Sequence, residues 1–277
     1  MDPLDAASIA SLIHIPGLDV RVVDRCSSTN ALLLAEVNER RQCAADHPVL
    51  LAAEEQSAGR GRRGRRWRSA RGAGATFSIL RRMRCTPRLL GGLSLAVGVA
   101  TARALRALGA GDVALKWPND LLAGGGRDGV NQAGAKLGGI LIETRMQERE
   151  IAAVVGIGIN CRPVRRLGAQ LRRRLAALDE LVQPAPARNT VIAAVAREVL
   201  AALESYETAG LPAFAGDWRA LHAHEGRRLR VRLADGSTVN GIAAGLAPDG
   251  ALRLQTRAGT RDVASGRILS SRAAGAA

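Results

Sequence analysis

The sequence contains few aromatic residues and almost no lysine. Phe, Trp and Tyr together make up 2% of the 277 residues, so a packed core has to be built from Leu, Val, Ile and Ala. Scarce aromatics also disfavour a surface that stacks single-stranded nucleic acid. Among 40 basic residues, Lys116 and Lys136 are the two lysines. Both lie inside polar motifs, which suggests positions that require an ammonium group.

The sequence also lacks the signatures of a secreted, zinc-binding or membrane-spanning protein. Its four cysteines are widely spaced with no Cys-x-x-Cys pair, which argues against a disulfide scaffold and a zinc site. The N-terminus has no basic signal-peptide region. The longest charge-free apolar run, Leu89 to Ala102, is too short to cross a bilayer. We therefore expect a cytoplasmic protein with no membrane partner.

The net charge of +15 is carried almost entirely by arginine. Such a charge suits an acidic partner such as a nucleotide, an acidic protein or a nucleic acid. A general bias towards Arg, Ala and Gly would produce the same excess without any polyanionic partner. With 47% hydrophobic and 23% charged residues, the chain is expected to fold as one large α/β domain, alone or with a second, small domain.

An Arg- and Gly-rich segment, Gln56 to Trp67, follows the apolar run Pro48 to Glu54, which predicts a buried strand. Its glycines permit a tight turn and close approach to a ligand, and its arginines surround that turn with positive charge. It matches neither the Walker A nor the Rossmann glycine pattern, which argues against a P-loop NTPase and a dehydrogenase. The segment alone is compatible with an anion-binding loop and with a flexible basic loop.

Apolar periodicity predicts a mixed α/β N-terminal part. Strands are expected at residues 20–24, 48–54, 75–82, 113–117, 137–144 and 151–159. Helices are expected at residues 31–41, 87–108, 166–182, 190–209 and 213–223, with Pro87 opening the second and Asn189 capping the fourth. The stretch from Ala123 to Ala135 is expected to be a flexible loop.

Short alternating segments predict a small β-barrel at the C-terminal end. Its strands are expected at residues 228–233, 238–246, 251–256 and 260–263, with Asp-Gly turns between them. We place the domain boundary between residues 1–222 and 223–277. His222 and His224 have no third ligand nearby, so we expect surface residues and no metal site.

Two polar motifs lie at the ends of predicted strands. One is Lys116-Trp117-Pro118-Asn119-Asp120, and the other begins Lys136-Leu137-Gly138-Gly139. Binding sites on α/β sheets gather polar residues at such strand ends. For Trp117, core packing is the expected role.

Five motifs in order make the chain resemble a biotin protein ligase, also called biotin–[acetyl-CoA-carboxylase] ligase. They are Ser-Thr-Asn at 28–30, Gly-Arg-Gly-Arg-Arg-Gly at 59–64, Lys-Trp-Pro-Asn-Asp at 116–120, Lys-Leu-Gly-Gly-Ile-Leu at 136–141 and Gly-Ile-Gly-Ile-Asn at 156–160. The resemblance implies an α/β (α+β) catalytic domain with a mixed β-sheet and helices, of the class II aminoacyl-tRNA-synthetase-like type shared with lipoate ligases. It also implies a small C-terminal SH3-like β-barrel.

The resemblance implies an activity and its partners. Members of that family join biotin to ATP as biotinyl-5'-AMP and transfer biotin to a lysine of a biotin carboxyl carrier protein, a subunit of acetyl-CoA carboxylase. Bringing two anions together needs dense positive charge and a metal ion, here Mg²⁺. Some members carry an N-terminal winged helix that represses biotin-synthesis genes; this chain resembles the class without it, so specific DNA binding is not expected. Dimers are common in the family, which implies a candidate homodimer.

The resemblance also implies roles for single residues. Lys136 is expected to bridge the biotin carboxylate and the α-phosphate, and Arg62 to help retain the adenylate. Biotin contacts are implied for Ser28, Thr29, Gln56, Gly59, Arg60, Arg62, Lys136, Gly139, Leu141 and Gly156. Nucleotide contacts are implied for Arg62, Arg63, Arg65, Trp67, Asn119, Asp120 and Asn160, with Asp120 as the candidate Mg²⁺ ligand.

Two alternative functions stay open at this point. A lipoate or octanoate ligase would share the fold, although the Arg-Gly loop and the C-terminal barrel favour biotin. A basic nucleic-acid-binding module would predict tight binding that weakens steeply with salt.

Overall fold

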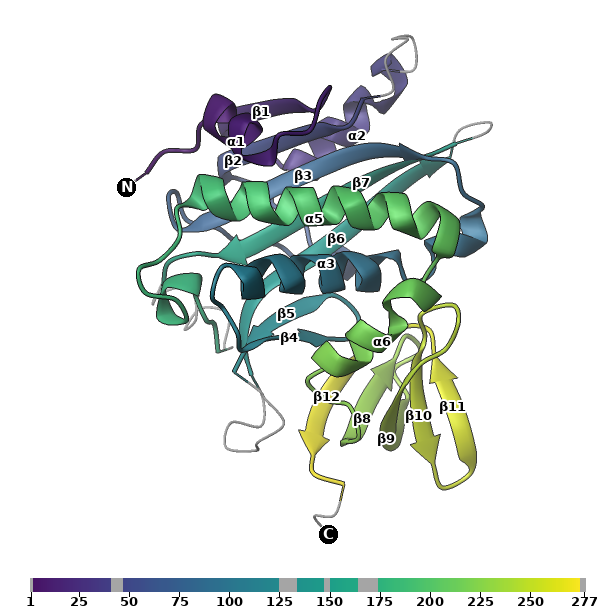
Figure 1. Ribbon diagram of the computed structural model, residues 1–277. Coiled ribbons are helices and arrows are strands. Elements are labelled where there is room, and N and C mark those ends of the chain that lie inside the picture. Colours follow the sequence, from purple (N-terminus) through teal and green to yellow (C-terminus); the bar gives the residue numbers. More distant parts are fainter. Residues whose placement is uncertain (1, 41–46, 125–133, 147–149, 164–173, 275–277) are drawn as a thin grey trace.

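A seven-stranded sheet forms the centre of the larger, N-terminal part of the protein (Figure 1). The computed structural model describes residues 2–40, 47–124, 134–146, 150–163 and 174–274. The strand order is β1-β2-β3-β7-β6-β5-β4; β1 and β2 run parallel, and all other neighbours are antiparallel. The strands are β1 (Asp19–Cys26), β2 (Val49–Gln56), β3 (Gly74–Met83), β4 (Val113–Lys116), β5 (Asp120–Ala123), β6 (Ala135–Met146) and β7 (Ile151–Asn160).

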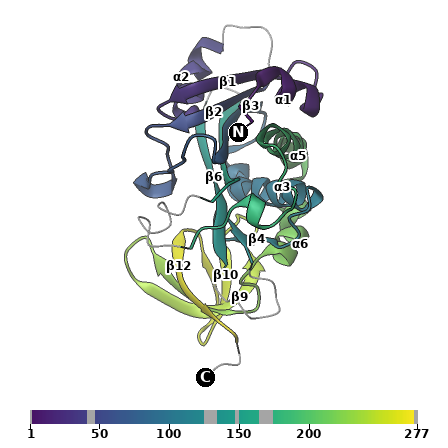
Figure 2. The same ribbon diagram turned by 90° about the vertical axis from the view of Figure 1, so that its left-hand side faces the viewer.

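Helices cover the two faces of this sheet unequally (Figures 1 and 2). Helices α1 (Ala6–Ile13), α3 (Leu93–Ala107) and α5 (Arg188–Ala209) pack on one face, and α2 (Thr29–Arg40) packs on part of the other. The alternation within β2 follows this division, because Leu50 and Ala52 belong to the large core while Val49 and Leu51 pack with α2. The face that carries α2 therefore has room for a binding site beside that helix.

A second, five-stranded antiparallel sheet follows helix α6 (Pro212–Leu221). Its order is β11-β10-β9-β8-β12, built from β8 (Arg228–Leu233), β9 (Thr238–Leu246), β10 (Leu252–Thr256), β11 (Gly259–Val263) and β12 (Gly266–Arg272). Trp117 joins the two sheets, since its indole Nε1 donates to the carbonyl of Gly250 at 3.2 Å. The expected mixed α/β fold with a small C-terminal β part is confirmed, as is the burial of Trp117.

The predicted helix from Pro87 to Leu108 is wrong at its start. Residues Pro87–Leu90 form a short 3₁₀ helix, and α3 begins at Leu93 after a break at Gly91 and Gly92. Gly92 has a φ of 83°, and a Cβ there would approach Leu211 to 2.8 Å. The left-handed backbone of Gly92 and its close approach to Leu211 thus interrupt a segment that has helical periodicity.

The predicted helix at 166–182 is also wrong where the structure describes it. Residues 174–182 contain one 3₁₀ turn, Leu178–Glu180, and residues 166–173 lie outside the described residues. Asn189 does not cap α5, which begins at Arg188 after Ala187. The Asn189 side chain instead accepts from the backbone of Asp5 and donates to the carbonyl of Pro3.

Two strands, β5 and β12, were not predicted from the sequence. Strand β5 pairs with β4 through the turn after Trp117, and β12 is a mostly exposed, polar strand beside β8. Of the predicted loop 123–135, Ala123 and Ala135 are the ends of strands β5 and β6, and residues 125–133 lie outside the described residues.

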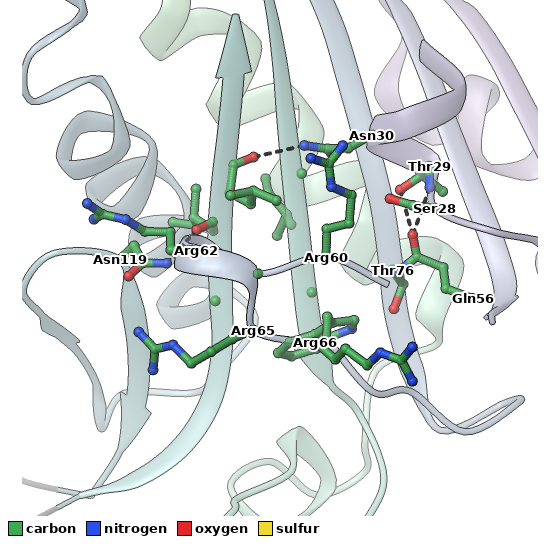
Figure 3. Close-up of a pocket in the computed structure, with 18 of the residues that line it drawn as sticks. Ser28, Thr29, Asn30, Gln56, Arg60, Arg62, Arg65, Arg66, Thr76 and Asn119 are labelled. Atoms are coloured by element: carbon green, nitrogen blue, oxygen red, sulfur yellow. Dashed lines mark hydrogen bonds between the residues drawn. The ribbon is translucent and has the colours of Figure 1, made fainter. Parts of the chain in front are cut away.

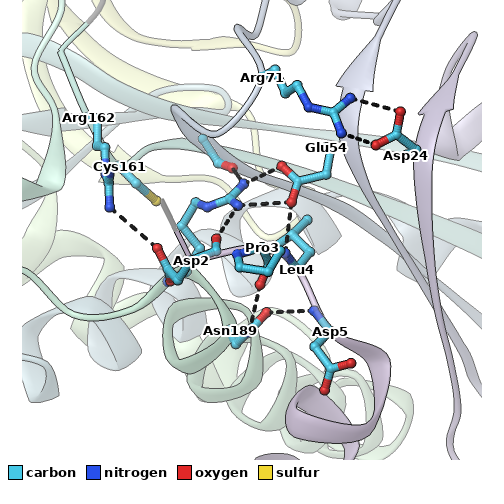
Figure 4. A network of polar contacts seen from close by, with 12 residues as sticks. Asp2, Pro3, Leu4, Asp5, Asp24, Glu54, Arg71, Cys161, Arg162 and Asn189 are labelled. Atoms are coloured by element: carbon cyan, nitrogen blue, oxygen red, sulfur yellow. Dashed lines mark hydrogen bonds and ion pairs between the residues drawn. The ribbon is translucent and has the colours of Figure 1, made fainter.

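A buried ion pair fixes the N-terminal segment to the sheet (Figure 4). The guanidinium of Arg188, at the start of α5, lies 2.8 Å from a carboxylate oxygen of Glu54 in β2. Glu54 also accepts from the backbone of Leu4, and Arg188 donates to the carbonyl of Asp2. The hydrogen bond from Arg188 lowers the pKa of Glu54.

No helix among the described residues is long and apolar enough to span a bilayer.

Candidate active site

A cavity lies beside α2 on the sheet face that this helix covers (Figure 3), with about 700 Å³ of empty space when the open solvent at its mouth is included. The start of α2, the middle strands and the Arg-Gly loop each contribute walls. Its lining residues are Ser28, Thr29, Asn30, Gln56, Arg60, Gly61, Arg62, Arg65, Arg66, Trp67, Thr76, Phe77, Asn119, Asp120, Lys136, Gly139, Ile140, Leu141, Gly156, Ile157 and Gly158.

Two glycines in β7 make space for the cavity. Ala152 and Val154, earlier in the same strand, pack with α2, and the alternation of the strand places Gly156 and Gly158 on that same face. A Cβ at either position would lie within 3.0 Å of another side chain, Asn30 for Gly156 and the ring of Trp67 for Gly158. The floor of the cavity is thus bare backbone, against which a ligand and these two side chains can lie.

Neutral polar side chains gather at one end of the cavity. The carboxamide oxygen of Gln56 accepts from the backbone N–H of Thr29 at 2.7 Å, and the hydroxyls of Thr29 and Ser78 are 2.6 Å apart. Ser28, Thr29 and Ser78 are buried. Ser28 lies at the start of α2, where its hydroxyl makes a long capping contact of 3.5 Å with the backbone nitrogen of Ala31.

The Arg-Gly loop folds as a tight hairpin over the other end. The backbone of Trp67 donates to Gly59, that of Gly61 donates to Arg65, and Arg60 pairs with Arg66. Arg60, Arg62, Arg65, Arg66 and Trp67 of this hairpin line the cavity, and Figure 3 shows the four arginine side chains extending from it in different directions.

The arginines of the loop have different electrostatic partners. Arg60 forms an ion pair of 2.9 Å with Glu143 on β6. Arg63 has a φ of 57° and donates to the hydroxyl of Ser265, between β11 and β12. No hydrogen bond or ion pair joins Arg62 to another described residue. Partial burial and the neighbouring Arg63 and Arg65 lower the pKa of Arg62, against the opposing attraction of Asp120. Arg62 is therefore the cation of the loop best placed to gain from a bound anion.

Lys136 faces the loop from β6. Its ammonium forms an ion pair with Asp120 and lies 5.8 Å from the ring centre of Trp67. The side chain of Asn160 donates to the carbonyl of Lys136 at 3.2 Å and to that of Ala176. Asn160 thus fixes the backbone that carries Lys136.

Most of the predicted site residues meet in this one cavity. Of them, Gly59, Arg63 and Asn160 lie outside its lining. Several lining residues, including Asn30, Arg66 and Thr76, were not among the predicted site residues. The alternation of Thr76 and Ser78 with Phe77 and Ile79 along β3 was a usable signal, because the two apolar residues belong to the core on the opposite face.

The prediction that His222 and His224 are surface residues is wrong. Both are buried, and the ring of His222 stacks on Trp218 with centres 4.2 Å apart. Among the described residues, no group of three or more His, Cys, Asp or Glu side chains is arranged to hold a metal ion.

Known proteins match both parts of the chain. Residues 22–160 match the model of the biotin/lipoate A/B protein ligase family, and residues 224–269 match that of the biotin protein ligase C-terminal domain. The biotin–[acetyl-CoA-carboxylase] ligase of Mycobacterium tuberculosis is 35% identical over 275 residues, which is 96% of each protein. The chain belongs to the biotin protein ligase family.

Further matches agree with this assignment. The bifunctional ligase/repressor BirA of Escherichia coli is 35% identical over 243 residues, 87% of this ligase and 71% of BirA. In fold, the ligase resembles the biotin protein ligase of Aquifex aeolicus, solved in complex with biotin and ATP. The TM-score is 0.70 at 24% identity, over 92% of this chain and 99% of that one. The C-terminal match favours biotin over the lipoate alternative, since that model describes biotin ligases.

Proposed function

We propose that this ligase joins the carboxylate of biotin to the α-phosphate of ATP and then passes the biotinyl group to a lysine of a biotin carboxyl carrier protein. In the first step a carboxylate oxygen attacks the α-phosphorus and pyrophosphate leaves. In the second step the lysine amine attacks the acyl carbon, loses a proton, and AMP leaves. The names of the relatives from M. tuberculosis and E. coli support the reaction type.

The observation that carries this proposal is the polarity of this cavity. Buried neutral groups around Thr29 and Gln56 lie at one end, and the cations Arg62 and Lys136 lie at the other. Biotin has the matching shape, with an uncharged ureido ring at one end and a carboxylate at the other. Binding at the neutral end would deliver the carboxylate to the cations.

Two buried polar atoms in the cavity support a ligand with hydrogen-bonding groups. Thr76 Oγ1 and Trp67 Nε1 have no hydrogen-bond partner among the described residues, although both belong to residues that line the cavity. A buried polar atom without a partner is costly. A polar ligand would satisfy these atoms.

Lys136 and Arg62 can serve different steps, Lys136 in forming the adenylate and Arg62 in retaining it. An ammonium group has three N–H donors, so Lys136 can hold Asp120 and also donate to a carboxylate and a phosphate. That would bring the reacting oxygen close to phosphorus and stabilise the charge that develops between them. Arg62 presents a forked guanidinium, which suits a phosphate and would retain the adenylate between the two steps.

A magnesium ion fits the carboxylate content of the cavity. Mg²⁺ in nucleotide sites is held by one or two carboxylates together with substrate phosphates and water. Asp120 is the carboxylate among the lining residues and would hold the ion. When bound, Mg²⁺ supplies positive charge that offsets the repulsion between the phosphates and the carboxylate.

The test is biotin-dependent exchange of labelled pyrophosphate into ATP. We expect Lys136→Ala to abolish exchange, while Arg62→Gly still forms the adenylate but releases it into solution. Arg257→Gly, at an exposed turn between β10 and β11, is the control and should leave exchange intact. Folded wild-type protein that shows no biotin-dependent exchange would refute the proposal. Equal loss of both half-reactions in Arg62→Gly would refute the division of labour.

A further inference from the structure

A chain of hydrogen bonds crosses the neutral end of the cavity. The hydroxyls of Thr29 and Ser78 are 2.6 Å apart, and Ser78 lies 2.6 Å from the carboxamide oxygen of Asn30. The amide nitrogen of Asn30 donates to Glu143 Oε2 at 3.0 Å and to the carbonyl of Leu141 at 3.3 Å. Figure 3 shows the bond that leaves Asn30 towards β6. The chain therefore ends on the carboxylate of Glu143.

Glu143 and the carbonyl of Leu141, which both accept from the amide nitrogen of Asn30, together fix the direction of every bond in this chain. A carboxylate can accept but not donate, so the amide nitrogen of Asn30 must face it and the amide oxygen must face Ser78. Ser78 then has to donate its one proton to Asn30. At the 2.6 Å contact Thr29 therefore donates to Ser78, in preference to its longer contact of 3.2 Å with the carboxamide oxygen of Gln56. The lone pairs of Thr29 are left to face the cavity. This end is thereby set to accept an N–H group from a ligand.

The second oxygen of Glu143 holds the Arg-Gly loop. Glu143 Oε1 lies 2.9 Å from the guanidinium of Arg60, and the Glu143 side chain is 18% exposed. A charge-assisted bond at a mostly buried carboxylate is stronger than an exposed surface pair. Asn30 is itself held in place from below, since a Cβ on Gly156 would lie within 3.0 Å of its amide.

We propose that Glu143 is a positioning residue that joins two tasks. One carboxylate oxygen keeps the loop closed through Arg60, and the other orients Asn30, Ser78 and Thr29 as acceptors for a ligand N–H. The assignment rests on the proposed function for the identity of the ligand, whose ureido ring carries such N–H groups. Its effect on the loop does not depend on any ligand.

The test replaces Glu143 by glutamine, which keeps the size of the side chain and removes its charge. The loop arginines are cleavage sites for trypsin, so the rate of tryptic cleavage at 60–66 in the unliganded protein reports loop opening. We expect Glu143→Gln to raise this rate about tenfold, the equivalent of one charge-assisted hydrogen bond. Glu36→Gln is the matched control, because Glu36 forms an ion pair of the same 2.9 Å length with Arg21, away from the cavity.

Ligand binding supplies the second readout. In Glu143→Gln, the dissociation constant for biotin should rise about tenfold, and the adenylate should be released faster. The melting temperature of Glu143→Gln should equal that of the control Glu36→Gln. A double-mutant cycle with Arg60→Met separates the two tasks, because the release rates of the single and double variants should be non-additive. In Asn30→Ala, by contrast, biotin affinity should fall while tryptic cleavage at the loop stays at the wild-type rate.

The outcomes distinguish this proposal from the proposed function. If cleavage of the loop in Glu143→Gln matches that in Glu36→Gln, Glu143 does not hold the loop and the proposal is refuted. If cleavage rises but the wild-type protein binds no biotin, the role of Glu143 at the loop stands and the ligand assignment fails. Faster cleavage accompanied by a lower melting temperature would indicate a merely structural role and would also refute it.

Discussion

Replacing Gly158 by alanine should displace Trp67 from the wall of the cavity. A Cβ at residue 158 would lie within 3.0 Å of three atoms of the Trp67 indole, closer than side chains pack. Strand β7 is bonded to β3 and β6 on its two sides, so the backbone cannot retreat. The indole, carried by a loop, has to move instead.

The magnitude follows from the contacts that Trp67 would lose. Fully burying a large apolar side chain contributes about 1.5–3 kcal/mol, so the half-buried Trp67 would lose about half of that. The loss of the Lys136 ammonium near the ring, now 5.8 Å from its centre, adds about 0.5–1 kcal/mol. We therefore expect ligand affinity to fall about 10- to 60-fold, since each 1.4 kcal/mol is about tenfold. Global stability should change little, because Trp67 is only half-buried.

Tryptophan fluorescence makes this prediction directly measurable. Of the three tryptophans, Trp117 and Trp218 are buried in the core, so a ligand-dependent signal should come from Trp67. In Gly158→Ala the emission should shift to the red, and its response to biotin should approach that of Trp67→Phe. Gly216→Ala is the control, because a Cβ there meets no atom within 4 Å. Wild-type affinity together with an unshifted emission in Gly158→Ala would refute the reasoning.

Two buried titratable groups give further predictions. Burial, together with His222, Lys116 and Arg227, lowers the pKa of His224 to about 3. Its unfolded pKa is about 6.5, so stability should fall below about pH 6.5 by up to 1.4 kcal/mol per pH unit for this group. Thermal melts of His224→Phe should show a weaker dependence on pH, and the part due to His222, whose pKa is also lowered by burial, should remain. Glu54→Gln should leave Arg188 buried without its counter-charge and cost about 2–3 kcal/mol in urea unfolding at pH 7. Since the pKa of Glu54 is lowered, its contribution is present above about pH 4.3 and is lost as pH falls through the folded value, so wild type and variant should converge at acid pH below that folded value.

Local sequence patterns predicted the parts of the fold that depend on periodicity. The apolar runs that became β2, β3, β6 and β7 are long and bounded by turn residues, so each strand was found within a few residues. Lys136 and the Arg-Gly loop were expected to share a cavity, and they do. The motifs that carry chemistry lie at strand ends or in turns, where residue type is constrained by the ligand as well as by packing.

Tertiary contacts decided the features that the sequence did not reveal. The break before α3 depends on Leu211, which is distant in sequence from Gly92. The burial of His222 depends on Trp218 and on the neighbouring β4, since the backbone after His222 bonds to Leu115. Glu143 carried no signal for loop positioning, because its partner Arg60 is far away along the chain. Side-chain pairs of this kind become visible only when strand register is known.

The arrangement of charges explains how an arginine-rich protein can make one selective anion site. Glu143 largely neutralises Arg60, Asp120 pairs with Lys136, and Arg63 turns to Ser265 outside the cavity. The net charge of +15 is spread over the surface and screened by salt beyond about 8–10 Å. Arg62, by contrast, is partly buried beside like charges that lower its pKa. A phosphate at Arg62 would relieve this repulsion, so local desolvation and pairing, rather than the total charge, should determine where a nucleotide binds.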